Sequence, residues 1–125
     1  MILVDTSVWV DHLHKGDSQL VELLESNAVI MHPFIVGEIA CGSLADRSLT
    51  LDLLQLLPMA SVAEFSEVLG YVERYKLHGK GIGYVDAHLL ASAAICGAKL
   101  WTRDKKLQAV AHKLGNAFAD QRTSK

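Results

Sequence analysis

Four acidic residues stand in apolar stretches of the sequence, where an unpaired carboxylate is costly to bury. Asp5 directly follows the first apolar run, and Asp104 follows a later run by two residues. Glu38 and Asp86 lie between apolar neighbours in segments of helical character. Carboxylates without a nearby histidine or thiol are hard oxygen ligands, which favour Mg²⁺ or Mn²⁺ over zinc. If the four meet, the sequence predicts a binding site for such a divalent cation.

Three hydroxyl residues flank these acids and are candidates for orienting a carboxylate or a water molecule: Thr6, Ser7 and Thr102. Each acid also has an ordinary explanation when taken alone. Asp5 could be a helix cap, Asp104 a surface ion-pair partner, Glu38 a solvent-facing residue and Asp86 a favourable first-turn residue. The metal hypothesis therefore depends on the four coming together.

The elements that must position the acids alternate between strands and helices. Apolar runs predict strands over 2–4, 28–31 and 99–102, with an edge strand over 115–119. Amphipathic or capped stretches predict helices over 17–25, from Pro33 to about Leu44, over 64–77 and 84–96, and on a last face that includes Leu107 and Leu114. This alternation predicts an α/β domain over 1–125, with a parallel sheet covered on both faces and a polar tail after about 120. In such sheets the ligand site lies at the carboxyl ends of the strands.

Details of three segments follow from the same patterns. Thr6 or Ser7 is expected to cap the helix after the first strand. Five apolar residues of the 64–77 helix are expected to face inward: Phe65, Val68, Leu69, Val72 and Tyr75. Cys41 and Cys96 are expected to be small buried hydrophobes.

Composition excludes several classes of protein. The chain has 125 residues, half of them hydrophobic and 21% charged, which is ordinary for a globular domain. Neither a membrane span nor a signal peptide is visible, because the start lacks a basic segment and reaches Asp5 at once. Two cysteines favour a reducing compartment, so a cytoplasmic location is expected.

The charge is unevenly distributed along the chain. The formal net charge of −2 argues at first against a nucleic-acid partner. Residues 1–73 hold eleven acidic and two basic residues, whereas 74–125 hold three acidic and ten basic ones. The basic part offers candidates for holding an RNA backbone: Lys80, Arg103, Lys105 and Lys106, together with Lys76 and Lys113.

Four segments together resemble a known family, the PIN domain, and in particular the VapC toxins of bacterial toxin–antitoxin pairs. They are Met1–Trp9, Pro33–Ile39, Tyr84–Ala91 and Leu100–Leu107, in the order and at the spacing of the family. The resemblance covers nearly the whole chain. It implies a three-layer α/β/α fold and a Mg²⁺- or Mn²⁺-dependent endoribonuclease.

The resemblance also assigns roles to residues and partners. It maps the acidic catalytic and metal-binding positions of the family onto Asp5, Glu38, Asp86 and Asp104, and the hydroxyl positions onto Thr6 or Ser7 and Thr102. It implies a small antitoxin, similar to VapB, that covers the site, and a homodimer.

Two alternatives belong to other classes. A receiver-like signalling domain also places acids, a hydroxyl residue and Mg²⁺ at the carboxyl ends of a parallel sheet, but it needs paired acids after the first strand. Here Asp5 is followed by Thr6 and Ser7. The second alternative is a catalytically silent PIN-like module that only docks a partner helix, with the leucine stripe at 49–57 as a groove wall.

Overall fold

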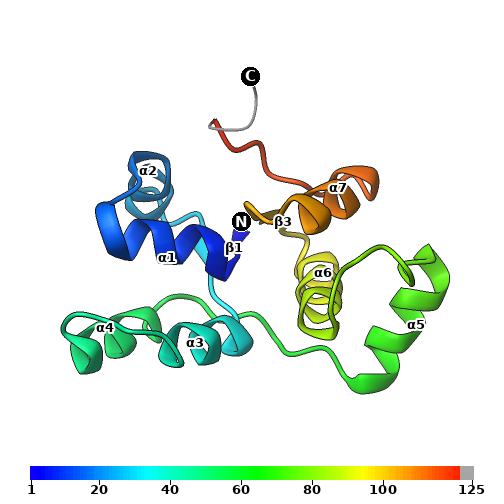
Figure 1. The fold of residues 1–125 in the computed structure, drawn as a ribbon, viewed down its shortest axis with the longest axis horizontal. Coiled ribbons are helices and arrows are strands. Elements are labelled where there is room, and N and C mark those ends of the chain that lie inside the picture. The colour runs from blue at the N-terminus through cyan, green and yellow to red at the C-terminus, as the bar shows by residue number, and fades with distance from the viewer. Residues whose placement is uncertain (122–125) are drawn as a thin grey trace.

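The structure is a computed structural model in which residues 1–121 are described. A short sheet occupies its centre, with strands β1 (Ile2–Val4), β2 (Val29–Ile30) and β3 (Lys99–Trp101). The helices are α1 (Thr6–Lys15), α2 (Ser18–Glu25), α3 (Pro33–Ala40), α4 (Arg47–Leu54), α5 (Phe65–Tyr75), α6 (Tyr84–Cys96) and α7 (Lys105–Lys113). Figure 1 shows α1 and α2 on one side of the strands and α6 and α7 on the other. This is the α/β arrangement that the sequence predicts.

The sheet is parallel, with β1 between the other two strands in the order β2-β1-β3. Leu3 pairs with Ile30 and with Leu100, so all three strands end at the same edge. The backbone N–H of Asp5 donates to the carbonyl of Trp101 at 2.8 Å, which continues the pairing one residue beyond β1. The residues that follow β1 and β3 are therefore neighbours in space.

The core forms where the apolar strands meet the alanine-rich helix α6. Leu3, Val4 and Trp101 are fully buried, as is Leu90 of α6. Small side chains allow close approach, and the buried alanines of α6 let that helix pack tightly. This packing fixes the position of the first turn of α6, which carries Asp86.

Several boundaries differ from those that the sequence predicts. The helix after Pro33 ends at Ala40, because the chain turns at Cys41 and Gly42 well before Leu44. The predicted edge strand over 115–119 is reduced to a single parallel bridge between Leu100 and Ala117. Neither Thr6 nor Ser7 caps α1: Asp5 occupies the cap position, and both hydroxyls lie inside the helix.

One burial prediction is confirmed only in part and another is wrong. Val68 is buried and Val72 packs half-buried against the core, whereas Leu69, Tyr75 and Phe65 are exposed, Phe65 by 66%. Helix α5 lies at the edge of the molecule and makes its main packing contact with α6, so much of its apolar stripe has no cover (Figure 1). Cys41 and Cys96 are both exposed, because they stand at the ends of α3 and α6.

The residue at the start of the predicted polar tail belongs to the folded domain. Asp120 is buried at 1% exposure, and its carboxylate takes part in contacts inside the domain. Residues 122–125 of the predicted tail lie outside the described residues. None of the described helices is long and apolar enough to cross a membrane.

Candidate functional site

Asp5 is held at the end of β1 by two hydroxyl groups. Its side chain is nearly buried, and Oδ2 accepts hydrogen bonds from Ser7 Oγ at 2.9 Å and from Thr102 Oγ1 at 2.8 Å. The backbone N–H of Arg103 donates to Ser7 Oγ, which fixes that hydroxyl in turn. Ser7 and Thr102 therefore orient the Asp5 carboxylate at the edge of the sheet.

Glu38 is brought to the same region by a contact between two helices. Thr6 Oγ1, in the first turn of α1, donates to Glu38 Oε1 at 2.6 Å. Glu38 itself is exposed on α3. The Thr6 hydroxyl thus ties this carboxylate to the turn that follows β1.

The pKa of Asp86 is affected by the charges of the other three acids. It is half-buried in the first turn of α6, where Oδ2 accepts from the backbone N–H of Gly83 at 3.1 Å. Burial raises the pKa of the Asp86 carboxyl above its ordinary value, and the nearby charges of Asp5, Asp104 and Glu38 raise it further, against the Gly83 hydrogen bond. The four predicted acids therefore lie within electrostatic range of one another.

Asp104 completes the group and also begins a helix. Its Oδ1 accepts from the backbone N–H of Leu107 at 2.9 Å, which caps α7, and its own N–H donates to Thr102 Oγ1. Thr102 therefore contacts both Asp5 and Asp104. Among residues 1–121, Asp104 forms a helix cap in place of the surface ion pair suggested for it, and its carboxylate stays exposed beside the other acids.

The donor set fits a hard divalent cation by its chemistry. Among residues 1–121, no lysine, arginine or histidine forms an ion pair with any of the four carboxylates. Burial is the main cause of the raised pKa of Asp86, and the negative charge of the other three acids adds to it. Over the same residues, no three histidine, cysteine, aspartate or glutamate side chains already stand close enough to hold a metal ion. The acids gather, but their present spacing is not that of a complete ligand set.

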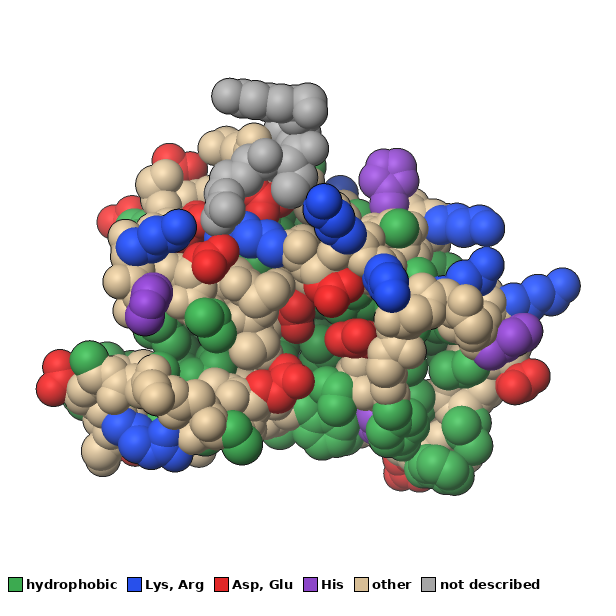
Figure 2. Space-filling view, viewed as in Figure 1, with side chains coloured by type: hydrophobic (Ala, Val, Ile, Leu, Met, Phe, Trp, Pro, Cys, Tyr) green, Lys and Arg blue, Asp and Glu red, His purple; other side chains and the backbone are tan. Residues whose placement is uncertain are grey.

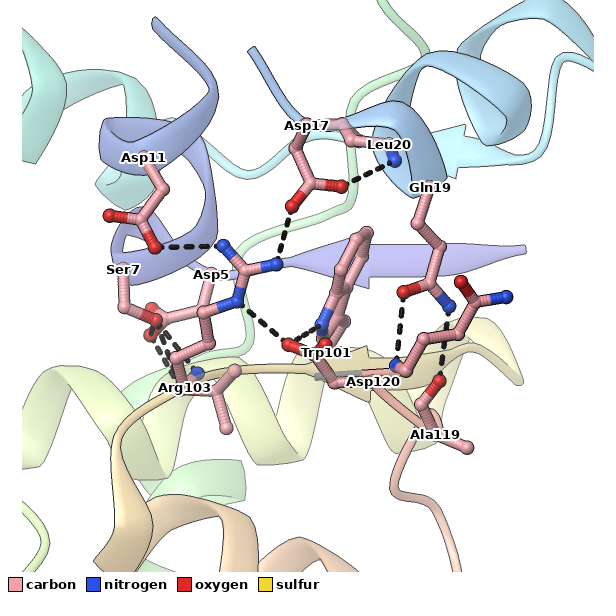
Figure 3. Close-up of polar contacts among 12 residues, drawn as sticks. Asp5, Ser7, Asp11, Asp17, Gln19, Leu20, Trp101, Arg103, Ala119 and Asp120 are labelled. Atoms are coloured by element: carbon pink, nitrogen blue, oxygen red, sulfur yellow. Dashed lines mark hydrogen bonds and ion pairs between the residues drawn. The ribbon is translucent and has the colours of Figure 1, made fainter. Parts of the chain in front are cut away.

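Arg103 is occupied elsewhere, which removes it from the predicted RNA contacts. Its guanidinium pairs with Asp11 at 2.7 Å, Asp17 at 2.5 Å and Asp120 at 2.7 Å (Figure 3). The side chain is only 10% exposed, and its pKa is raised by these hydrogen bonds in spite of burial. Trp101 Nε1 also donates to Asp120. Arg103 therefore joins α1, α2 and the C-terminal segment.

The predicted lysines are exposed and lie along one side of the site. Lys105 and Lys106 occupy the first turn of α7, immediately after Asp104, and Lys80 lies in the loop before α6. Figure 2 shows acidic side chains in the middle of this face and Lys and Arg side chains over α7 and the end of α5. The uneven charge along the sequence thus persists in space.

A buried histidine that sequence reasoning did not assign links two of the acid-bearing helices. His32 is fully buried, its Nδ1 accepts from the backbone N–H of Phe34, and its Nε2 lies 3.1 Å from Ser92 Oγ on α6. We assign the proton to Nε2, because Nδ1 accepts. Burial, with a smaller contribution from nearby His88, lowers the pKa of His32 to about 4. The proline after His32 was the only signal, because it marks a helix start.

Comparisons with known proteins agree with this geometry. Residues 2–113 match the PIN domain. The chain is 48% identical over 122 residues to Ribonuclease VapC32 of Mycobacterium tuberculosis, covering 97% of this chain and 98% of that protein. PAE2754 from Pyrobaculum aerophilum shares the fold with a TM-score of 0.65 at 18% identity, over 94% of this chain and 87% of that chain. FitAcB from Neisseria gonorrhoeae has a TM-score of 0.61 at 22% identity, over 90% and 94%.

Proposed function

Because the chain belongs to the PIN-domain family and within it to the VapC ribonucleases, we propose that it is a metal-dependent endoribonuclease. One observation of this chain carries the proposal. Four carboxylates from four elements gather at the carboxyl edge of the sheet with no ion-pairing cation among residues 1–121. Anions that the fold does not neutralise itself are suited to an external cation.

Asp5, Glu38, Asp86 and Asp104 are the residues that would hold Mg²⁺ or Mn²⁺. A bound ion of this kind lowers the pKa of water and offsets charge on the phosphoryl oxygens. The contribution of the chain is to orient its carboxylates. Two hydroxyls hold Asp5, and Thr6 holds Glu38. Rigid placement matters, because small errors in position are costly in catalysis.

We also propose that the enzyme acts as the toxin of a toxin–antitoxin pair. A groove between α1 and the α3–α4 region is lined by apolar residues that include Val10, Leu13, Ile39 and Leu44. Glu38 lines the same groove, so a helix or strand of an antitoxin lying there would contact the proposed site. A homodimer and a cytoplasmic location remain predictions from the sequence.

The test is RNA cleavage by variants that keep the shape of each side chain. Asp5→Asn and Asp86→Asn, made separately, are assayed with Mg²⁺, with Mn²⁺ and with EDTA. We expect each variant and the EDTA sample to lose about 100-fold or more in rate. Asp52→Asn, at an exposed acid of α4, is the control and should cleave normally. Full RNA cleavage by Asp5→Asn or by Asp86→Asn, or by the wild type in EDTA, would contradict the proposal.

The same assay addresses the alternatives. The PIN match over residues 2–113 speaks against a receiver-like domain. A silent docking module would bind its partner but cleave no RNA with either metal, although its fold is intact. That outcome would replace the ribonuclease proposal.

A further inference from the structure

A second basic feature lies away from the carboxylates, between the end of α5 and helix α7. A cleft of about 390 Å³ is lined by Lys76, Lys80 and Lys113, with Leu77 and Val110 forming its apolar floor. Among the residues that the structure describes, no acidic side chain lines it. Three cations around one depression form a local positive field that attracts an anionic ligand.

The fold holds these lysines in place through their neighbours. Lys76 ends α5 in the left-handed region with φ 53°, and the backbone N–H of the buried Leu77 then donates to the carbonyl of Val72. Val110 anchors the opposite wall on α7. Among the described residues, the three lysines form no ion pair or side-chain hydrogen bond, and all are exposed. Their charges are therefore available to a ligand.

A continuous path joins this cleft to the carboxylate site. Lys106, two residues after Asp104, lies across Gly81: a Cβ added there would stand 2.6 Å from Lys106 Cδ. Gly81 has φ +80° and directly follows Lys80, which lines the cleft. The basic side chains therefore run from the start of α7, over the glycine loop, to the end of α5. Figure 2 shows blue side chains along this side of the molecule.

We propose that the cleft formed by Lys76, Lys80 and Lys113 binds the phosphate backbone of single-stranded RNA outside the cleaved bond. This inference rests on the proposed ribonuclease function. A basic groove that follows the backbone is how proteins hold single strands without reading their sequence. RNA is favoured over an acidic protein segment because the basic path begins beside the carboxylates that the scissile phosphate must reach. Lysines in the cleft offset the repulsion that those acids exert on the strand.

The proposal predicts a dependence on RNA length. If the cleft holds only nucleotides beyond those at the cleaved bond, a substrate of about four nucleotides should be cleaved equally by the wild type and by Lys76→Gln/Lys113→Gln. With a substrate of about 20 nucleotides, we expect the double variant to lose roughly tenfold in kcat/KM, through KM. A loss of equal size on both substrates would contradict a separate backbone site.

Binding measured in EDTA keeps this test independent of cleavage. A fluorescent single-stranded RNA of about 20 nucleotides is titrated at several salt concentrations. Lys76→Gln/Lys113→Gln loses two phosphate contacts, so its plot of log affinity against log salt concentration should be less steep than that of the wild type by about 1.4. Lys15→Gln/Lys99→Gln removes the same charge from exposed positions outside the path and is the matched control.

Each outcome decides the inference. A loss confined to the cleft variant supports it, and melting curves establish that both double variants are folded. Equal losses in both variants would mean that only net charge matters, and unchanged binding in the cleft variant would likewise overturn the proposal. Stronger binding of polyglutamate than of RNA to the wild type would assign the cleft to an acidic protein. Failure of the ribonuclease function appears separately, as absence of cleavage by the wild type.

Discussion

Two groups of acidic side chains lie on this domain, and they differ in where their counter-charge comes from. Asp11, Asp17 and Asp120 surround the guanidinium of Arg103 (Figure 3). Asp5, Glu38, Asp86 and Asp104 gather at the sheet edge without an ion-pairing partner among residues 1–121. The two groups meet in the sequence where Arg103, the cation of the first group, directly precedes Asp104, an acid of the second.

The difference shows how one chain divides acids between structure and function. In the first group, Arg103 of the chain itself supplies the positive charge, so the ion pairs connect α1, the start of α2 and the C-terminal segment. In the second group, burial and, to a smaller extent, repulsion by the other acids raise the pKa of Asp86, which is a cost that the metal-free fold bears. Strained or unsatisfied features of this kind collect at functional sites.

Removing the built-in cation should have the largest effect on stability. Arg103→Met removes the guanidinium that three carboxylates share, one of which has no side-chain exposure. We expect a loss of about 3 kcal/mol in the free energy of unfolding, measured by urea denaturation. Lys99→Met, at an exposed lysine, is the control and should change little. A loss below about 0.5 kcal/mol would show that Arg103 does not stabilise the fold.

The histidine that joins α3 to α6 should make stability depend on pH. The folded pKa of His32, about 4, lies below the ordinary 6.5, because His32 is buried near His88. The fold thus favours neutral His32, and its contribution is complete above pH 6.5 and lost as pH falls from 6.5 to 4. Between pH 7 and 5, the wild type should lose about 2 kcal/mol from this source.

His32→Asn provides the comparison for that prediction. Asparagine can still accept the N–H of Phe34 at the helix start but does not titrate. Urea denaturation at both pH values should show a smaller loss in the variant than in the wild type. Equal losses would mean that other groups, the carboxylates included, account for the pH dependence.

Removing one negative charge from the sheet-edge acids should have the smallest effect on stability, and it should increase stability where the other changes reduce it. In EDTA at pH 7, Asp86→Asn should raise the free energy of unfolding by less than about 1 kcal/mol, because it removes a charge that its neighbours repel. Mg²⁺ should then stabilise the wild type but not the variant, as seen in melting temperature. Destabilisation by Asp86→Asn in EDTA would mean that the charged carboxylate supports the fold.

The sequence indicates the acid group because its signals are local. Apolar runs end at Asp5 and shortly before Asp104, and strands of a parallel sheet end at a common edge. The helix predicted over 84–96 is confirmed at both ends. Gly83 occupies its N-terminal cap position, and Gly97, in the left-handed region, ends it. These features depend on residues a few positions apart.

The Arg103 group could not be predicted, because its partners come from distant parts of the chain. Asp11, Asp17 and Asp120 are brought to Arg103 only once the sheet and helices have assembled. The exposure of Phe65 has a similar cause, since its periodic pattern is that of a helix but α5 lies at the edge of the domain and packs mainly on α6. Periodicity identifies an apolar face but not whether another element covers it.

Mn²⁺ binding is the most direct test of the central claim, that the sheet-edge acids need an external cation and the Arg103 group does not. Free Mn²⁺ is followed by electron paramagnetic resonance as the protein is titrated in the absence of RNA. The wild type should bind Mn²⁺, Asp86→Asn should bind at least about tenfold more weakly, and Asp17→Asn should bind like the wild type. Equal binding by the wild type and Asp86→Asn, or no binding by the wild type, would contradict the account.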